Sequence, residues 1–76
     1  MKATKDRITE IIKEAAGDHV DVNSLKVDKP LIDQGVDSLD HMSFFMEIEE
    51  EYDVRIPDDD YQKLRSIKDI VDYLNK

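Results

Sequence analysis

The chain has 76 residues, no cysteine, and 19 acidic against 11 basic side chains, which gives a formal net charge of −8. A chain of this length is predicted to form one domain over residues 1–76. Without cysteine it has no disulfide framework, no thiol nucleophile and no cysteine-based metal site. The acidic balance argues against nucleic acid as a partner, because phosphate contacts need clustered lysine and arginine.

No apolar run reaches the roughly 20 residues that a membrane-spanning helix needs, and residues 1–18 are amphipathic rather than continuously apolar. We therefore expect a cytoplasmic protein without a membrane span. The negative charge suggests partners with basic surfaces, although acidity that serves only solubility would explain the same composition. Charge repulsion and small size favour a monomer.

A first amphipathic helix is predicted near the N-terminus, with Thr4 as its N-cap and Gly17 as a left-handed C-cap residue. Its apolar side is formed by Ile8, Ile11, Ile12, Ala15 and Ala16, and its polar side by Lys5, Asp6, Glu10, Lys13 and Glu14. The polar stretch 18–36 follows with several turn signals. It is predicted to be a long loop, anchored by its own apolar residues.

Three further helices are predicted. Asp37 suits the N-cap of a second helix from about Ser38 to Tyr52, with Asp40 in its first turn. Pro57 and the three aspartates after it predict a short third helix.

The third helix is expected to end near Leu64, and Ser66-x-x-Asp69 resembles the capping box of a last helix. The expected buried stripe of that helix is Ile67, Ile70, Val71 and Leu74. The predicted fold is an all-α four-helix bundle, with three longer helices, one short helix and a long loop between the first two.

On a helical wheel of about 100° per residue, six side chains of the second helix share one arc, which we take as its core face. They are His41, Met42, Phe44, Phe45, Ile48 and Tyr52. Leu39 and Met46 fall outside this arc beside Ser43, Glu47 and Glu50. Apolar side chains among acids form a candidate docking surface, although single exposed apolar residues are also common on surfaces that bind nothing.

Ser38 lies in the first turn of the same helix, where its hydroxyl projects near backbone N–H groups without intrahelical partners. A phosphate ester at this position would lie in the favourable field of the helix N-terminus. A serine that only helps to cap the helix fits the same position, so both interpretations stay open on these grounds.

The segment Gly35-Val36-Asp37-Ser38-Leu39-Asp40 resembles the Asp-Ser-Leu attachment motif of acyl carrier proteins. The resemblance covers nearly the whole chain. Segments 31–37, 48–52, 54–58 and 67–74 are similar to the family's approach loop, acidic helix end, next turn and last helix.

This resemblance implies that Ser38 accepts 4'-phosphopantetheine from coenzyme A through a phosphopantetheinyl transferase, and that Asp37 helps to place the metal ion used in that transfer. The thiol of the arm would carry acyl groups as thioesters to synthases or ligases with basic surfaces, in fatty acid, polyketide or related specialised biosynthesis. The domain itself would be no enzyme and would hold no metal of its own.

The resemblance also makes the second helix the main partner face. The contacts that it implies there are Leu39, Asp40, Met46, Glu47 and Glu50, together with the attachment-site residue Asp37. The helical core would part to shelter an acyl chain, and its implied lining is Phe44, Phe45, Ile48, Ile56, Leu64 and Ile67.

Five positions depart from the pattern of fatty-acid-synthesis carriers. Gln34 replaces a usual leucine, Ser43 a usual glutamate, and His41 a small residue, while Phe44-Phe45 is bulkier than the usual aliphatic pair. These departures suggest a specialised carrier for an unusual acyl, polyketide or aminoacyl group.

His41, the acidic loop and the carrier fold each allow an alternative interpretation. His41 could serve as a base near Ser38, but a structural histidine is favoured because no triad partner is in view. Asp21-x-Asn23 begins like a calcium-binding loop, yet the positions that need an oxygen ligand and a glycine hold Leu25 and Lys26. A docking module that keeps the carrier fold without carrying thioesters, or an aminoacyl or peptidyl carrier, remains compatible with the sequence.

Overall fold

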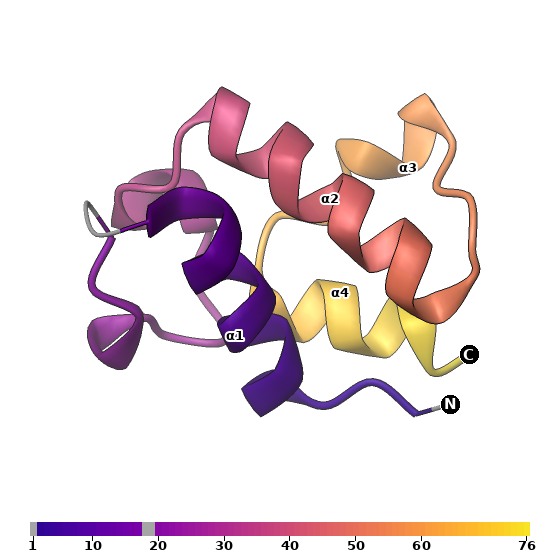
Figure 1. Ribbon diagram of the computed structural model, residues 1–76, viewed down its shortest axis with the longest axis horizontal. Coiled ribbons are helices and arrows are strands. Elements are labelled where there is room, and N and C mark those ends of the chain that lie inside the picture. Colours follow the sequence, from indigo (N-terminus) through magenta and orange to yellow (C-terminus); the bar gives the residue numbers. More distant parts are fainter. Residues whose placement is uncertain (1, 18–19) are drawn as a thin grey trace.

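Helices joined by loops make up the computed structural model, which describes residues 2–17 and 20–76 (Figure 1). The elements are α1 (Lys5–Ala16), η2 (Val22–Ser24), η3 (Leu31–Gln34), α2 (Ser38–Tyr52), α3 (Asp58–Tyr61) and α4 (Ile67–Leu74), where η denotes a 3-10 helix. These two ranges contain no strand. The predicted all-α bundle, with one short helix and a long loop after the first helix, is confirmed.

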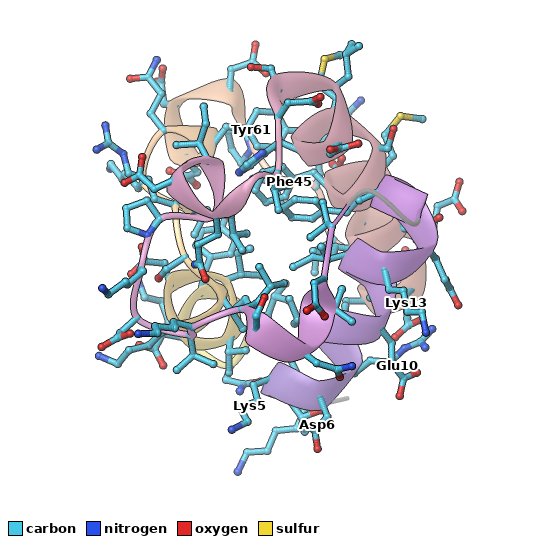
Figure 2. All side chains as sticks on the ribbon, turned by 90° about the vertical axis from the view of Figure 1, so that its left-hand side faces the viewer. Lys5, Asp6, Glu10, Lys13, Phe45 and Tyr61 are labelled. Atoms are coloured by element: carbon cyan, nitrogen blue, oxygen red, sulfur yellow. The ribbon has the colours of Figure 1, made fainter. Side chains whose placement is uncertain are left out.

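Helix α1 has the predicted caps. The Thr4 hydroxyl accepts a hydrogen bond from the backbone N–H of Arg7 at 3.2 Å. Gly17 ends the helix with the predicted positive φ of 72°, although its ψ of −150° lies outside the left-handed helical region. The buried face consists of Ile8, Ile11, Ile12 and Ala16. Figure 2 shows the charged side chains of Lys5, Asp6, Glu10 and Lys13 along the outer side of α1, as expected.

Helix α2 begins and ends at the predicted residues, Ser38 and Tyr52. Asp37 is its N-cap, and the chain leaves the helix through Asp53 in the left-handed region, with φ 51° and ψ 50°. Aspartate tolerates this conformation better than most residues. The N–H of Val54 then donates to the carbonyl oxygen of Glu49 at 3.1 Å.

Helix α3 is shorter than predicted. It ends at Tyr61, and Leu64 lies in the turn that follows, where its N–H still donates to the Tyr61 carbonyl oxygen at 3.3 Å. The expectation that the helix reaches Leu64 is wrong. The chain turns there because Leu64 is buried in the core, and because the Arg65 carbonyl accepts the N–H of Leu31 at 2.8 Å.

The long loop between α1 and α2 is anchored as predicted, by buried side chains and by bonds to the C-terminal segment. Val20, Leu31 and Val36 are buried in the core. The N–H of Lys68 donates to the Val27 carbonyl at 2.9 Å, which ties the loop to the start of α4. Its first two residues, 18–19, lie outside the described ranges.

Gln34 holds the second half of this loop with its side-chain amide. The amide oxygen accepts the N–H of Lys26 at 2.6 Å, and the amide nitrogen donates to the carbonyls of Lys26 and Lys29, each at 3.0 Å. Leucine, the usual family residue at this position, makes no such bonds. The departure at Gln34 therefore has a structural role in shaping the approach to α2.

The core lies between α1, α2, α4 and the anchored loop. Its fully buried side chains include Ile8, Ile11, Ile12, Leu31, Val36, Phe44, Ile48, Ile67 and Ile70. In α4 the predicted stripe divides: Ile67 and Ile70 are buried, whereas Val71 and Leu74 are partly buried and pack against the core. The two chain ends lie side by side (Figure 1), joined by bonds between the backbone of Ala3 and the Asn75 amide at 2.7 and 2.9 Å.

Replacing Ser66 with alanine tests the capping of α4. The Ser66 hydroxyl accepts the N–H of Asp69 at 3.2 Å, and the Asp69 carboxylate accepts the N–H of Ser66 at 3.3 Å. We expect Ser66→Ala to lower the free energy of unfolding by about 1 kcal/mol, which corresponds to about 4–8 °C in melting temperature for a domain of this size. Ser43→Ala, on the exposed side of α2, is the control and should leave the melting temperature unchanged or slightly raised. Equal melting temperatures for both variants would contradict the capping role.

Candidate functional site

Ser38 is the first residue of α2, and its side chain is exposed. The first N–H groups of a helix lack intrahelical acceptors, and the helix dipole places partial positive charge at this end. A negatively charged group bonded to the Ser38 oxygen would therefore lie in a favourable field. The structure places this serine as the sequence predicted.

Reciprocal bonds between Asp37 and Asp40 fix the start of the helix. One carboxylate oxygen of Asp37 accepts the N–H of Asp40 at 2.9 Å, and a carboxylate oxygen of Asp40 accepts the N–H of Asp37 at 3.3 Å. Asp37 remains exposed beside Ser38, whereas Asp40 is only 8% exposed. The expectation that Asp40 is offered to basic partners is therefore wrong, because its carboxylate is turned inward to cap the helix.

His41 is held as a structural residue. Its Nδ1 donates to the carbonyl oxygen of Asp37 at 2.9 Å, since a carbonyl can only accept. Its ring lies against Phe44 and Phe45, with centroids 5.1 and 6.1 Å away. This placement favours the structural interpretation of His41 over a role as a base acting on Ser38.

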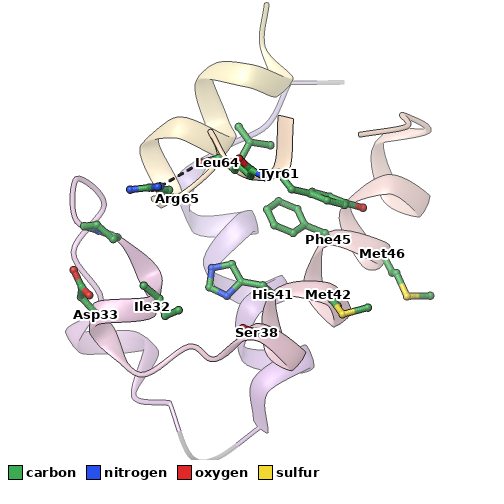
Figure 3. A pocket seen from close by; sticks show the side chains of 12 residues that line it. Ile32, Asp33, Ser38, His41, Met42, Phe45, Met46, Tyr61, Leu64 and Arg65 are labelled. Atoms are coloured by element: carbon green, nitrogen blue, oxygen red, sulfur yellow. Dashed lines mark hydrogen bonds between the residues drawn. The ribbon is translucent and has the colours of Figure 1, made fainter. Parts of the chain in front are cut away.

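A groove of about 730 Å³ opens beside Ser38 between η3, α2 and the segment from α3 to α4 (Figure 3). We call it the Ser38 groove, and its lining consists of Pro30, Ile32, Asp33, Ser38, His41, Met42, Phe45, Met46, Tyr61, Gln62, Leu64 and Arg65. Most of this surface is apolar, and it includes two methionine side chains and three rings. Apolar surface of this extent next to an exposed hydroxyl is a candidate binding surface.

An exposed apolar strip runs along α2 at the edge of the groove. Leu39 is 74% exposed and Met46 62%, so the prediction that they face solvent is confirmed. Met42 is 66% exposed, and its expected place on the core face is wrong. On the wheel Met42 lies about 60° from the exposed Leu39. Met42 lines the groove on that side of α2.

The opposite flank of α2 faces α1 across a smaller cleft of about 360 Å³. Its lining is Arg7, Ile11, Glu14, Glu47, Glu50 and Glu51. The guanidinium of Arg7 makes a two-pronged ion pair with Glu51, in which Nε donates to one carboxylate oxygen at 2.5 Å, and also contacts Glu10 at 3.0 Å. This pairing lowers the pKa of Glu51.

Glu47 in this cleft is partly buried. The helical wheel, in contrast, places it on the exposed side of the helix. Within the described residues, one of its carboxylate oxygens is buried without a hydrogen-bond partner. Desolvation, followed by repulsion from Glu14 and Glu50, raises the pKa of Glu47. Glu50 is exposed as predicted.

The acidic side chains that the structure describes do not gather into a metal centre. Within residues 2–17 and 20–76, no group of three or more histidine, aspartate and glutamate side chains is arranged to hold a metal ion. None of the helices in these ranges is long and apolar enough to cross a membrane.

Comparison with known proteins identifies the family. The family model described as "Phosphopantetheine attachment site" matches residues 6–74. The chain is 40% identical over 75 residues to an acyl carrier protein of Bdellovibrio bacteriovorus, an alignment that covers 97% of this chain and 94% of that one. This chain belongs to the acyl carrier protein family. It is also 47% identical over 62 residues to an acyl carrier protein of Syntrophobacter fumaroxidans, which covers 71% of this chain and 76% of that one.

Membership defines the class of function. An acyl carrier protein is a non-catalytic carrier that holds acyl groups on phosphopantetheine and works with a phosphopantetheinyl transferase and biosynthetic enzymes. The residues of this carrier fit such an arm, because an exposed hydroxyl at a helix N-terminus adjoins an apolar groove.

Sequence reasoning missed part of the groove of this carrier. Ile32, Tyr61 and Arg65 line it, yet they come from η3, α3 and the turn after α3. No local pattern links residues from three separate segments. The residues expected to line a core that parts for an acyl chain, Phe44, Phe45, Ile48, Ile56, Leu64 and Ile67, are all in the core, each at most 4% exposed. Two of them, Phe45 and Leu64, also line the groove.

The raised pKa of Glu47 predicts a pH-dependent cost to stability. Because the folded state binds the Glu47 proton more tightly than the unfolded state, stability associated with this group is lost as pH rises through the folded pKa. Glu47→Gln should therefore raise the free energy of unfolding at pH 7 by about 0.5 kcal/mol, as expected for removing two like-charge contacts.

Urea unfolding at several pH values measures this effect. The gain should vanish below about pH 4, where glutamate is protonated in both states. Glu50→Gln, at an exposed position, is the matched control with a smaller effect. A Glu47→Gln variant less stable than wild type at pH 7 would mean that attraction to Arg7 outweighs desolvation and repulsion.

Proposed function

We propose that Ser38 carries the 4'-phosphopantetheine arm of this carrier and that acyl groups are delivered from it to partner enzymes. The observation that carries the proposal is the exposed Ser38 hydroxyl at the N-terminus of α2, on the rim of an apolar groove. Exposure lets a transferase reach the hydroxyl, and the helix field favours the phosphodiester that forms there.

The attachment reaction assigns a role to each of the two motif residues. The Ser38 oxygen forms a bond to the phosphorus that bears the pantetheine in coenzyme A. The bond from that phosphorus to the 3',5'-ADP leaving group breaks, and the serine proton is released. Asp37 is exposed next to Ser38, and its carboxylate is oriented by the bond from the Asp40 N–H. It is therefore positioned to help place the metal ion that the transferase brings.

The arm supplies a thiol, on which acyl groups are carried as thioesters. The carrier needs no cysteine for this purpose. Its own residues only position the arm and protect the acyl group. Ser38 fixes the point of attachment, and α2 presents it to partners.

The partner face that we propose comprises the exposed strip of Leu39, Met42 and Met46 with Glu50 beside it. Asp40 takes no part, because it is buried, and Glu47 contributes charge from the edge of the face. Partners with apolar contacts surrounded by basic residues complement this surface. The net charge of −8 steers such partners and disfavours self-association.

Intact-protein mass spectrometry tests the attachment site. After incubation with coenzyme A, magnesium and a phosphopantetheinyl transferase of broad specificity, wild type should gain the mass of one phosphopantetheine. Ser38→Ala should gain nothing while keeping the helical circular dichroism spectrum and a melting temperature close to wild type. Ser43→Ala, five residues along the same helix, is the matched control and should be modified fully.

A mass gain in Ser38→Ala would place the attachment elsewhere. No gain in folded wild-type protein would instead favour the docking module that keeps the carrier fold without an arm. Ser38→Ala that fails to fold would make this serine a structural cap.

Reversing the charge of Glu50 tests the partner face. Glu50→Lys should lower kcat/KM of the transferase for this carrier by about 3–10-fold at low salt, because electrostatic steering is reduced. The difference should shrink at 0.5 M salt, where screening is strong. Asp72→Lys, exposed on α4, changes net charge equally and should have little effect. Equal losses in the two variants would mean that net charge alone matters and that α2 is not the face that the transferase contacts.

A further inference from the structure

A row of aromatic rings runs from the core to the Ser38 groove. Phe44 and Phe45 have ring centroids 4.7 Å apart, and Phe45 and Tyr61 have centroids 4.9 Å apart. Phe45 and Tyr61 line the groove, while Phe44 behind them is fully buried. We call Phe44, Phe45 and Tyr61 the aromatic wall. Figure 3 shows the rings of Phe45 and Tyr61 side by side at the back of the groove.

Hydrogen bonds hold the outer part of this wall in place. The Tyr61 hydroxyl donates to one carboxylate oxygen of Glu49 at 3.3 Å. The other carboxylate oxygen of Glu49 accepts the N–H of Ile56 at 3.0 Å. Glu49 therefore links α2 to the segment before α3 and to Tyr61 at once. Displacing the Tyr61 ring would break the first bond and leave charged Glu49 with one fewer donor.

The core behind the wall is filled. Phe44 and Ile48 are fully buried, and Ile56 and Leu64 are each 4% exposed. Protein interiors are packed like crystals, so a guest can enter only by displacing side chains. The groove in front of the wall needs no such displacement, and it begins at Ser38.

The groove also exposes apolar surface that lacks a cover. Ile32 is 61% exposed, Met42 66% and Met46 62%. A group tethered at Ser38 reaches this surface without diffusing to it, and a short flexible tether gives an effective concentration in the millimolar range. The tethered acyl group is therefore the occupant that the geometry favours.

Resting on the proposed attachment at Ser38, we infer that the acyl group lies in the Ser38 groove outside the core. The Phe45–Tyr61 contact excludes long straight chains from the core, and the carrier therefore favours compact ring-bearing or branched acyl groups, which the groove alone can cover. Tyr61 is then a specificity-determining residue of the carrier.

The preference for compact groups follows from the shape and chemistry of the groove. An open groove covers one side of its guest, so a long chain either leaves its tail in water or must enter the closed core. A ring gains contacts with aromatic faces beyond simple area burial, and the thioethers of Met42 and Met46 also pack well against rings. A short or flat guest is thus covered efficiently, whereas a long alkyl chain is not.

Methyl NMR on the loaded carrier tests where the acyl group lies. Protein labelled at isoleucine and methionine methyl groups is loaded at Ser38 from phenylacetyl-coenzyme A, dodecanoyl-coenzyme A or coenzyme A alone, and mass spectrometry confirms each product. For both acyl groups in wild type, the signals of Ile32, Met42 and Met46 should shift relative to the arm alone. Those of the buried Ile8, Ile48 and Ile70 should stay in place.

Two variants test whether the aromatic wall keeps long chains out of the core. Tyr61→Ala removes the ring, so dodecanoyl should now shift the Ile48 signal, while phenylacetyl should still shift only the groove signals. Tyr61→Phe keeps the ring and loses only the bond to Glu49, so it should behave as wild type with phenylacetyl and show at most a small Ile48 shift with dodecanoyl.

Melting temperatures give an independent readout. In wild type, the phenylacetyl group should raise the melting temperature at least as much as dodecanoyl does, despite its smaller apolar area. In Tyr61→Ala the order should reverse.

The outcomes separate this inference from the proposed function. If wild type gains no mass at Ser38, the attachment and the inference that rests on it both fail. If it loads normally but dodecanoyl shifts Ile8, Ile48 and Ile70 in wild type, the attachment stands and the barrier is refuted. Loading without shifts at Ile32, Met42 and Met46 refutes the groove as the binding surface.

Discussion

The hydrogen bonds between Asp37 and Asp40 decide where α2 begins, and the placement of Ser38 follows from that start. Both bonds satisfy backbone N–H groups at the helix end, which would otherwise lack acceptors. His41 adds two more bonds, since its ring nitrogen and its backbone N–H both donate to the Asp37 carbonyl. Burying Asp40 costs desolvation, which its hydrogen bonds offset.

Aromatic packing gives this carrier a core and a groove that are distinct. The resemblance implies that Phe44 and Phe45 line a core that parts for an acyl chain. In the structure both side chains are buried, and Tyr61 extends the row of rings to the groove. The bulky residues that set the chain apart from the family pattern are thus part of the core, and one of them, Phe45, also lines the groove.

Charge is distributed unevenly around α2. The flank toward α1 carries Glu47 and Glu51, and one guanidinium, that of Arg7, balances the second of them. Glu47 has no such hydrogen-bonded partner for its buried oxygen among the described residues, and the raised pKa reflects that cost. The flank toward the groove is apolar and exposed. The proposed partner face on α2 therefore combines apolar contacts with acids at their edge.

Local chemistry in the sequence determined the helices and their ends. Thr4, Asp37 and Ser66 are caps that act on residues two to four positions away, so their effect could be predicted without the fold. The Asp-Ser-Leu motif likewise indicated the family before any geometry was known. The spacing of apolar residues identified the cores of α1 and α4, since each of these helices has one buried face.

Only the tertiary structure decided which flanks of α2 are covered. The wheel places Met42 on the core face and the resemblance implies that Asp40 is presented to partners, yet Met42 is 66% exposed and Asp40 only 8%. Met42 lies on the rim of the groove, where the described segments leave it exposed. The groove has the same origin, since Ile32, Met42 and Tyr61 meet there from three segments. Periodicity tells which side chains share a face of one helix, but the faces that are buried depend on where other segments pack, and that is settled by contacts between residues distant in the sequence.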